Sequence, residues 1–377
     1  MGTSEDVKLG VIGACGRGGG LAGAIEHIDG ATVHAVCDIN AEALPEAKQR
    51  LGAAEAWTSV EEMLDCSDLD AVIVGTPMHL HVPHAIMALE RGIHVLSEVT
   101  AAVSIEQCRH LVAACARSRA QYMMAENACY LKHVAIVTEM VRRGVFGDLY
   151  YGEGEYLHDL KELNERTPWR RTWQNGIDGI TYGTHPLGPL LMWLGWDRAV
   201  RVCCEGSGHH HLDPRGEPYR QDTAVMLCKT AGGALLKIRD DMISDRPGCS
   251  NNWVLQGTRG TFDSDRYGFY ELDVMRVWAE ELREEHKWLT LAEVADEFMP
   301  EGWRRIADAE EKGGHGGSDF FVVGDFVAMV RGERPNPIDV HRAMDMTLPG
   351  LVSQQSIQED GRWLDVPDSR DWQVSGP

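Results

Sequence analysis

Short apolar runs alternate with helical patterns along the first 125 residues of the chain. The apolar runs predict strands at Lys8–Ile12, Thr32–Cys37, Ala71–Val74, His94–Ser97 and Tyr122–Ala125. The stretches between them predict helices at Gly18–His27, Ala41–Leu51, His81–Arg91 and Ile105–Ser118. Such alternation is typical of a parallel, doubly wound sheet, whose ligands bind at the carboxyl ends of its strands. We therefore expect an α/β protein with an N-terminal Rossmann domain.

The pattern changes after Asn127, where a helix expected at Leu131–Arg143 leads into longer apolar runs with few helices between them. These runs predict strands at Leu149–Leu157, Ala199–Glu205, Thr223–Lys229, Ala234–Asp240, Trp253–Gly257 and Gly260–Asp263. Helices are expected at Asp319–Arg331 and His341–Gln358, whereas the charged segment 264–314 yields no element. Successive strands favour an α+β domain with a large, mainly antiparallel open sheet. We expect a nucleotide-binding domain over residues 1–126 and a substrate-binding domain over 127–377, whose C-terminal helices can pack back on the first.

Composition narrows the class of protein. A length of 377 residues suggests two domains, and 44% hydrophobic with 25% charged residues indicates a globular chain. A net charge of −22 disfavours nucleic acid and anionic membranes as partners. Residues 1–6 lack a basic and apolar start, so no secretory signal is expected, and no apolar run is long enough to span a membrane. Ten scattered cysteines without a CxxC pair favour reduced thiols and a cytoplasmic protein.

A glycine-rich turn follows the first expected strand. Gly13, Gly16 and Gly18 flank Cys15 and Arg17, and such a turn brings backbone N–H groups to a pyrophosphate at a helix N-terminus. Asp38 ends the second expected strand twenty residues after Gly18. A carboxylate there accepts the ribose hydroxyls and repels a 2′-phosphate, which favours NAD over NADP. The alternative for Asp38 is an ordinary helix N-cap.

Together with these segments, Thr76-Pro77-Met78-His79-Leu80-His81 and the block 92–98 resemble the Gfo/Idh/MocA family of sugar oxidoreductases. The resemblance covers essentially the whole chain and implies an NAD cofactor, with a sugar held between two domains against the nicotinamide. Where most of the family has Glu-Lys-Pro, this chain has Glu98-Val99-Thr100, so the lysine that helps move the substrate hydroxyl proton is missing. The family's Asp-x-Gly-x-His becomes Thr181-Tyr182-Gly183-Thr184-His185, which keeps only the histidine and gains a tyrosine.

One branch is more similar: the NAD-dependent glycosidases of glycoside hydrolase family 109, which have Glu-Val in place of Glu-Lys. The similar segments lie at residues 126–130, 156–160, 182–189, 255–260 and 313–320. The resemblance implies transient oxidation at C3 of a sugar, elimination between C1 and C2, addition of water and re-reduction, without net cofactor use. The alternatives are a sugar or cyclitol dehydrogenase that releases NADH, and a nicotinamide-binding regulator without turnover.

The residues expected at the site follow from these matches. Tyr182 and His185 are the expected proton-handling groups, although Tyr182 packing in a loop is the alternative. The expected substrate contacts are His158, Asp159 (which could orient the His158 ring), Trp169, Arg170, Tyr130 and His315. The expected cofactor contacts are Gly13, Cys15, Gly16, Arg17, Gly18, Asp38, Thr76, Pro77, His79, His81, Glu98 and Asn127. A simple strand-end histidine remains open for His158, a surface or dimer role for Trp169-Arg170, and a loop anchor for Glu98.

Histidine groups also raise the question of a metal. His209-His210-His211 lies between Gly208 and Pro214, so an exposed loop is favoured over a metal site. His79, His81 and His84 lie near the Thr76-Pro77 loop, where packing at the cofactor's edge is favoured. No catalytic metal is expected. The substrate is expected to be a small carbohydrate or glycoside, and the protein is expected to form a homo-oligomer through the sheet of its C-terminal domain.

Overall fold

The computed structural model describes residues 6–266, 270–282, 286–306 and 312–372. Contacts within the chain divide it into two compact units. The first comprises Met1–Tyr130, Asp308–Met344 and Ser369–Pro377, and the second comprises Leu131–Ala307 and Asp345–Asp368. The first unit therefore extends four residues beyond the expected boundary and includes two later segments of the chain. None of the helices in the described ranges is both long and apolar enough to cross a bilayer.

The described part of the first unit contains a six-stranded sheet in the order β3-β2-β1-β4-β5-β6, with every neighbouring pair parallel. Its strands are β1 (Val7–Ile12), β2 (Ala31–Cys37), β3 (Glu55–Trp57), β4 (Ala71–Val74), β5 (His94–Ser97) and β6 (Tyr122–Met124). The central strand β4 is buried along its whole length, because helices cover both faces of a parallel sheet. The order and the parallel pairing are those of a Rossmann fold, which confirms the predicted class.

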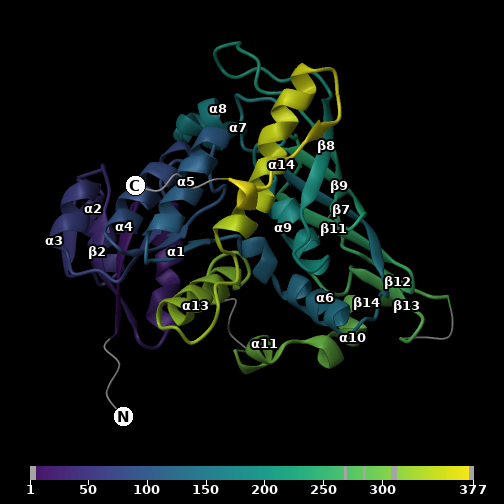
Figure 1. Ribbon diagram of the computed structural model, residues 1–377, viewed down its shortest axis with the longest axis horizontal. Helices are drawn as coiled ribbons and strands as arrows, with labels where there is room; N and C mark the ends of the chain where they lie inside the picture. The colour runs from purple at the N-terminus through teal and green to yellow at the C-terminus, as the bar shows by residue number, and fades with distance from the viewer. Residues whose placement is uncertain (1–5, 267–269, 283–285, 307–311, 373–377) are drawn as a thin grey trace. The chain divides into compact units, whose positions relative to one another are not determined.

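Helices surround this sheet (Figure 1). They are α1 (Arg17–Ala22), η1 (Gly23–His27), α2 (Leu44–Arg50), α3 (Val60–Cys66), η2 (Met78–Leu80), α4 (His81–Glu90), α5 (Ile105–Arg117), η3 (Asn127–Tyr130), α13 (Ser318–Val330) and η4 (Ser369–Asp371). The late helix α13 packs against α1, η1 and η3, so a segment far along the sequence lies beside the glycine turn. The helix expected at Gly18–His27 is shorter than predicted, because its second half is a 3₁₀ helix.

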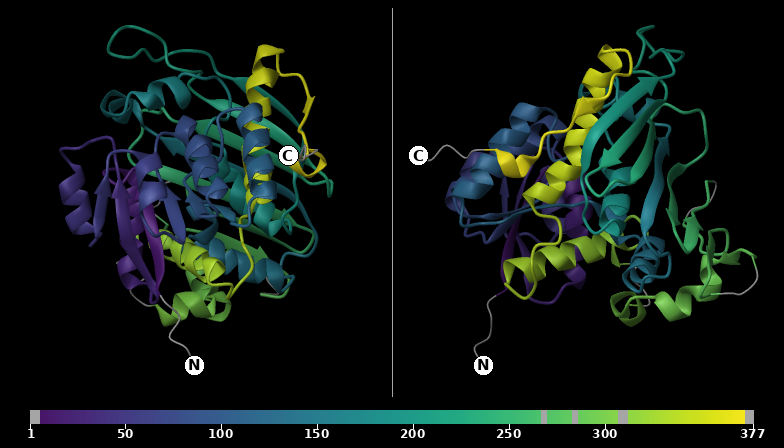
Figure 2. Two further views of the ribbon diagram at one scale, coloured as in Figure 1. Left: turned by 60° about the vertical axis from the view of Figure 1, so that its left-hand side comes forward. Right: turned by 45° about the vertical axis from the view of Figure 1, so that its right-hand side comes forward.

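The second unit contains a nine-stranded sheet in the order β14-β13-β12-β11-β7-β10-β9-β8-β15 within the described residues (Figure 2). Its strands are β7 (Leu149–His158), β8 (Ala199–Gly206), β9 (Ala224–Thr230), β10 (Leu235–Asp241), β11 (Cys249–Gly257), β12 (Gly260–Asp263), β13 (Arg276–Ala279), β14 (Leu289–Thr290) and β15 (Leu364–Asp365). Only β7 and β10 pair in parallel among these described strands, so the sheet is mainly antiparallel, as predicted.

The second unit also contains helices. They include α6 (Lys132–Arg142), α7 (Lys161–Arg166), α8 (Trp169–Trp173), α9 (Thr184–Trp193), α10 (Leu291–Phe298), α11 (Glu301–Arg305) and α14 (Val340–Gln358), whose first turn belongs to the first unit. Helix α9 lies against β7, β10 and β11. It was not predicted, because its two prolines and its glycine read as helix breakers. Pro186 lies in the first turn of α9, where a missing N–H costs nothing.

The segment 264–314, which yielded no prediction, contains β13, β14, α10 and α11 together with residues outside the described ranges. A sequence signal for α10 was present. Thr290 accepts a hydrogen bond from the amide of Glu293, whose side chain returns to the amide of Thr290. This capping box precedes an apolar face that includes Val294 and Phe298. The box could have identified the helix despite the charged surroundings.

Candidate active site

Three glycines bring the turn after β1 into backbone contact with the loop after β4. Gly13 has a φ of +85°, a conformation that L side chains rarely adopt. A Cβ on Gly75 would lie 2.3 Å from the N and Cα atoms of Gly18, and a Cβ on Gly18 would lie 2.8 Å from the carbonyl oxygen of Gly13. Side chains are thus excluded where the backbone must approach a pyrophosphate, and the residues present fit a dinucleotide.

Asp38 lies at the end of β2 and holds the same turn. Its carboxylate accepts hydrogen bonds from the amides of Cys15 and Asn40, each at 2.9 Å. The Cys15 amide is therefore engaged by Asp38, whose carboxylate oxygens keep lone pairs for ribose hydroxyls. Burial, together with the nearby Asp38 carboxylate, raises the pKa of the Cys15 thiol to about 11, so the thiol is neutral at pH 7.

Arg17 and Glu98, both expected at the cofactor, are joined to each other. Arg17 Nε lies 2.7 Å from Glu98, and the guanidinium also donates two hydrogen bonds to Asp319 at the start of α13. Asn127 donates to the same carboxylate at 3.2 Å, and His315 Nδ1 lies 3.1 Å from it. Asp319 therefore contacts three predicted site residues directly, and Arg17 links it to a fourth, Glu98, although no role was expected for Asp319.

The pKa of Asp319 reflects these contacts. Burial raises it, but the hydrogen bonds from Arg17 and His315 outweigh burial and hold it well below its usual range. The carboxylate is therefore ionised throughout the neutral range. His315 has a positive φ of 53° and a half-exposed side chain, so its imidazole can reach solvent while Asp319 fixes one ring nitrogen.

The loop that begins with Thr76 and Pro77 is held by histidines. His81 is buried, and its two ring nitrogens each lie 2.8 Å from a backbone carbonyl, that of Thr76 and that of Thr100. His84 Nδ1 lies 3.2 Å from the Thr76 hydroxyl, and burial lowers the pKa of His84 to about 4. These side chains brace the loop from within, which favours packing at the cofactor's edge over ligation of a metal.

His79 and Tyr130 also contribute to the interior of the first unit. The carbonyl of His79 accepts a hydrogen bond from Gln107 of α5, and burial lowers the pKa of the His79 imidazole. The Tyr130 hydroxyl donates to Asp325 of α13 at 3.1 Å. Tyr130, which was expected in the substrate pocket, therefore helps to join η3 to α13.

In the second unit, three aromatic rings gather around Tyr156 of β7. The ring centroids of Tyr182 and His185 each lie 5.4 Å from that of Tyr156, and they lie 5.0 Å from each other. The Tyr156 hydroxyl is 3.1 Å from His158 Nδ1. The structure thus brings together the expected Tyr182, His185 and His158. The central residue, Tyr156, was missed, although it lies in one of the matching segments.

Electrostatics set the protonation of this group. Burial raises the pKa of Tyr156 well above its ordinary value, while the nearby Arg170 acts in the opposite direction. Burial lowers the pKa of His158, and Arg170 lowers it further. At neutral pH His158 is therefore an uncharged imidazole that can accept the Tyr156 proton through Nδ1. The arrangement can transfer a proton between a phenol and an imidazole.

The expectation that Asp159 orients His158 is wrong, because the ring nitrogen of His158 meets Tyr156. The Asp159 carboxylate instead accepts from the Lys161 amide and pairs with the Lys161 ammonium at 3.2 Å. Trp169 and Arg170 stack on each other, with the guanidinium 4.4 Å from the ring centroid, and Arg170 also donates to Gln174. The charge of Arg170 is therefore held in place beside Tyr156 and His158.

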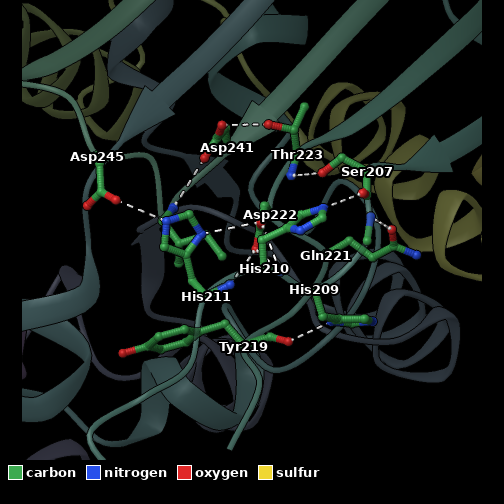
Figure 3. Close-up of polar contacts among 12 residues, drawn as sticks. Ser207, His209, His210, His211, Tyr219, Gln221, Asp222, Thr223, Asp241 and Asp245 are labelled. Carbon is green, nitrogen blue, oxygen red and sulfur yellow. Dashed lines mark hydrogen bonds and ion pairs between the residues drawn. The ribbon is translucent and has the colours of Figure 1, made fainter. Parts of the chain in front are cut away.

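The three consecutive histidines lie in the connection between β8 and β9 and turn to different partners (Figure 3). His209 Nδ1 lies 2.9 Å from the Tyr219 carbonyl, and His210 Nε2 lies 3.0 Å from the Ser207 carbonyl. His211 is placed between Asp222 at 3.3 Å and Asp245 at 3.0 Å. Among the described residues, no group of three histidines, cysteines or carboxylates is arranged to hold a metal ion.

Two family models cover nearly all of the chain. Residues 7–126 match the oxidoreductase family described as an NAD-binding Rossmann fold, and residues 130–373 match the C-terminal domain of glycosyl hydrolase 109. The two models meet at η3, within a few residues of the boundary between the two units. The resemblance seen in the sequence motifs is confirmed.

Individual relatives agree with these matches. A glycosyl hydrolase family 109 protein of Shewanella woodyi is 30% identical over 96% of this chain and 84% of its own length. A protein of Shewanella oneidensis named alpha-N-acetylgalactosaminidase is 29% identical over 97% of this chain and 85% of its own. Among solved structures, a levoglucosan dehydrogenase in complex with NADH superposes with a TM-score of 0.79 at 20% identity, covering 97% of this chain and all of that one. The chain therefore belongs to the glycosyl hydrolase 109 family and is an NAD-dependent enzyme with an N-terminal Rossmann domain.

Proposed function

We propose that the protein is a glycoside hydrolase that oxidises its substrate transiently and regains the oxidised cofactor in each turnover. The observation that carries this proposal is the Tyr156 group, in which Tyr182, His185 and His158 each contact Tyr156. Hydrolysis by a carboxylate pair needs no such group, whereas repeated proton transfers at adjacent carbons of a sugar do. The relative named alpha-N-acetylgalactosaminidase supports glycoside cleavage.

The glycine turn and Asp38 would hold NAD⁺, which would supply a reversible hydride acceptor for C3 of the sugar, so that no net cofactor would be consumed. Tyr182 and His185 take the proton of the C3 hydroxyl as C3 becomes a ketone. The ketone acidifies the C2 proton, and a phenolate of Tyr156 or Tyr182 removes it as the C1–O bond breaks. A protonated side chain returns a proton to the leaving oxygen. Water then adds its hydroxyl at C1 and a proton at C2, and the C3 hydroxyl is restored.

The chain's own residues account for the acid–base requirements of this sequence. A buried tyrosine is a poor base alone, because burial raises its pKa. Arg170 favours the phenolate of Tyr156, and a neutral His158 can receive its proton. The imidazole of His158 therefore offers an acceptor for the proton that the buried Tyr156 phenol must give up when it acts as a base.

The test follows two products in one assay. Purified protein is given p-nitrophenyl glycosides, beginning with the α-N-acetylgalactosaminide, with and without added NAD⁺. We expect release of p-nitrophenol without net accumulation of NADH, and cleavage in D₂O should place deuterium at C2 of the product sugar. Stoichiometric formation of NADH from free sugars would instead identify a dehydrogenase. If neither p-nitrophenol nor NADH is formed, the nicotinamide-binding regulator is favoured. Retention of the original hydrogen at C2 would exclude elimination from the mechanism.

We also propose that the protein forms a homo-oligomer through the face of the large sheet that lies away from α9. Gly152 and Gly154 of β7 project toward α9, so Glu153 between them projects on the opposite face. The residues paired with it across the neighbouring strands share that face: Val254, Lys237 and, next to Lys237, Leu227. Apolar and charged side chains, all partly buried, share this surface. Light scattering coupled to gel filtration measures the oligomeric state, and a monomer at micromolar concentration would overturn the proposal.

A further inference from the structure

The turn that carries Tyr182 rests on a buried ion pair. Arg220, near the end of the connection between β8 and β9, lies 3.2 Å from Asp240 of β10, and neither side chain is exposed to solvent. Removing two charges from water is costly, and apolar residues of similar size often stabilise a fold as well or better. Stability alone is therefore a weak explanation for this pair.

The pair contacts the short segment 179–182 at three points. Arg220 Nη1 donates to the Thr181 hydroxyl at 2.8 Å, and Arg220 Nη2 donates to the Gly179 carbonyl. Asp240 accepts the amide of Tyr182 at 3.3 Å. These contacts surround the residue whose hydroxyl the proposed reaction uses, and they come from two different elements of the second unit.

Further contacts fix Arg220 itself. Its own amide donates to the Asn175 carbonyl at 2.8 Å, and the next amide, that of Gln221, donates to Asp178 at 2.7 Å. The end of the β8–β9 connection is thereby tied to the segment that leads into the Tyr182 turn. A planar guanidinium with two engaged nitrogens also restrains rotation more than a flexible ammonium would.

We infer that Arg220 and Asp240 are positioning residues that set the place of Tyr182 relative to Tyr156 and His185. Neither residue is assigned a contact with the sugar. The pair instead fixes the backbone on both sides of Thr181, so that the phenol of Tyr182 approaches the Tyr156 ring in one orientation. The catalytic part of this inference rests on the proposed glycosidase function, whereas the restraint on the turn does not.

The test is the double variant Arg220→Met with Asp240→Leu, which removes both charges and leaves no unpaired buried ion. We expect it to fold and to bind NADH as the wild type does. We expect kcat for the p-nitrophenyl glycoside to fall on the order of a hundredfold, with a smaller change in KM, because small misplacements of a reacting group carry such costs. Arg220→Lys, which keeps the charge without the planar fork, should be intermediate and should shift the pH profile of kcat.

A matched control is Arg215→Met, since the Arg215 side chain lies in the same connection but is exposed, and its buried partner Asp213 keeps Arg171 as a second cation. It should leave kcat unchanged. Amide hydrogen exchange of residues 179–185 gives a readout independent of turnover, and it should be faster in the double variant. Unchanged exchange and unchanged kcat overturn the inference. If the wild type cleaves no glycoside, the proposed function fails, and the hydrogen-exchange rates alone decide whether Arg220 and Asp240 position the turn. If the double variant does not fold, the same measurements are made on Arg220→Lys.

Discussion

Arg17 and Asp319 lie 302 residues apart in the sequence and are joined by two parallel hydrogen bonds of 2.6 and 2.9 Å. Arg17 belongs to the glycine turn and Asp319 to the first turn of α13, so a helix from late in the chain holds the nucleotide loop. The side chain of Asp319 is 1% exposed. A bidentate pair in such surroundings fixes geometry as well as charge.

Replacing Asp319 by Asn should therefore weaken the binding of NADH. The substitution removes the negative charge to which Arg17 donates two hydrogen bonds and weakens the anchor shared by Asn127 and His315, so the glycine turn is held less firmly. We expect at least a tenfold rise in Kd, about 1.4 kcal/mol, measured by quenching of protein fluorescence. Asp65→Asn is the control, because Asp65 pairs with Arg91 on the surface of the same unit. Equal affinity in wild type and D319N would contradict a role for α13 in cofactor binding.

The contact between Gly75 and Gly18 predicts a steric effect of a single methyl group. Gly75→Ala places a Cβ 2.3 Å from backbone atoms of Gly18, which cannot move without displacing the turn. We expect loss of NADH binding and a lower midpoint of thermal unfolding. Gly20→Ala is the matched control, since no heavy atom lies within 4 Å of its Cβ. Gly20 is inside α1, so alanine there should be neutral or stabilise by up to about 1 kcal/mol. Comparable losses in both variants would refute the steric argument.

Tyr182→Phe tests the proton transfer directly. The ring contacts with Tyr156 and His185 remain, whereas the hydroxyl is lost, so folding and NADH affinity should be retained. We expect kcat for aryl glycosides to fall roughly 10²- to 10⁴-fold, the usual contribution of a positioned acid or base. Tyr156→Phe should have an effect of the same kind. Tyr150→Phe, an exposed tyrosine on β7, should leave turnover unchanged. A kcat for Tyr182→Phe within twofold of wild type would exclude the phenol from the reaction.

His211 predicts a pH dependence of the connection that spans residues 207–223. The hydrogen bond to Asp245 raises the pKa of His211, burial lowers it, and Asp222 raises it again, so the net shift is upward, although the neighbouring Lys161 opposes it. Since the folded pKa exceeds the unfolded value of about 6.5, the stabilisation is complete below that pH. It is lost as the pH rises through the folded pKa.

The measurement is amide hydrogen exchange of residues 207–223 at pH 6 and pH 8.5, corrected for intrinsic rates. We expect protection to decrease at the higher pH in the wild type. His211→Asn should be weakly protected at both pH values. His210→Asn should behave as the wild type, because within the described residues the His210 imidazole hydrogen-bonds only to the Ser207 carbonyl. A wild-type connection equally protected at both pH values argues against a charged His211 as its anchor.

Local patterns in the sequence were enough to locate the buried strands of the first unit and the turn whose backbone is restricted. Strands β1, β2, β4 and β5, the glycine turn and Asp38 were all visible, because short apolar runs and the need for glycine are local properties. The helix α9 was hidden by Pro186, since a proline's effect depends on where in a helix it falls.

Tertiary structure alone decided which side chains meet. Local patterns suggested that Asp159 would orient its neighbour His158, but strand alternation sends consecutive side chains to opposite faces, and His158 meets Tyr156 two residues away. Asp319 reaches Arg17, and Arg220 reaches the Tyr182 turn, only because distant segments are packed together. Periodicity reports which positions are buried, whereas the partner of a buried charge is selected by the three-dimensional path of the chain.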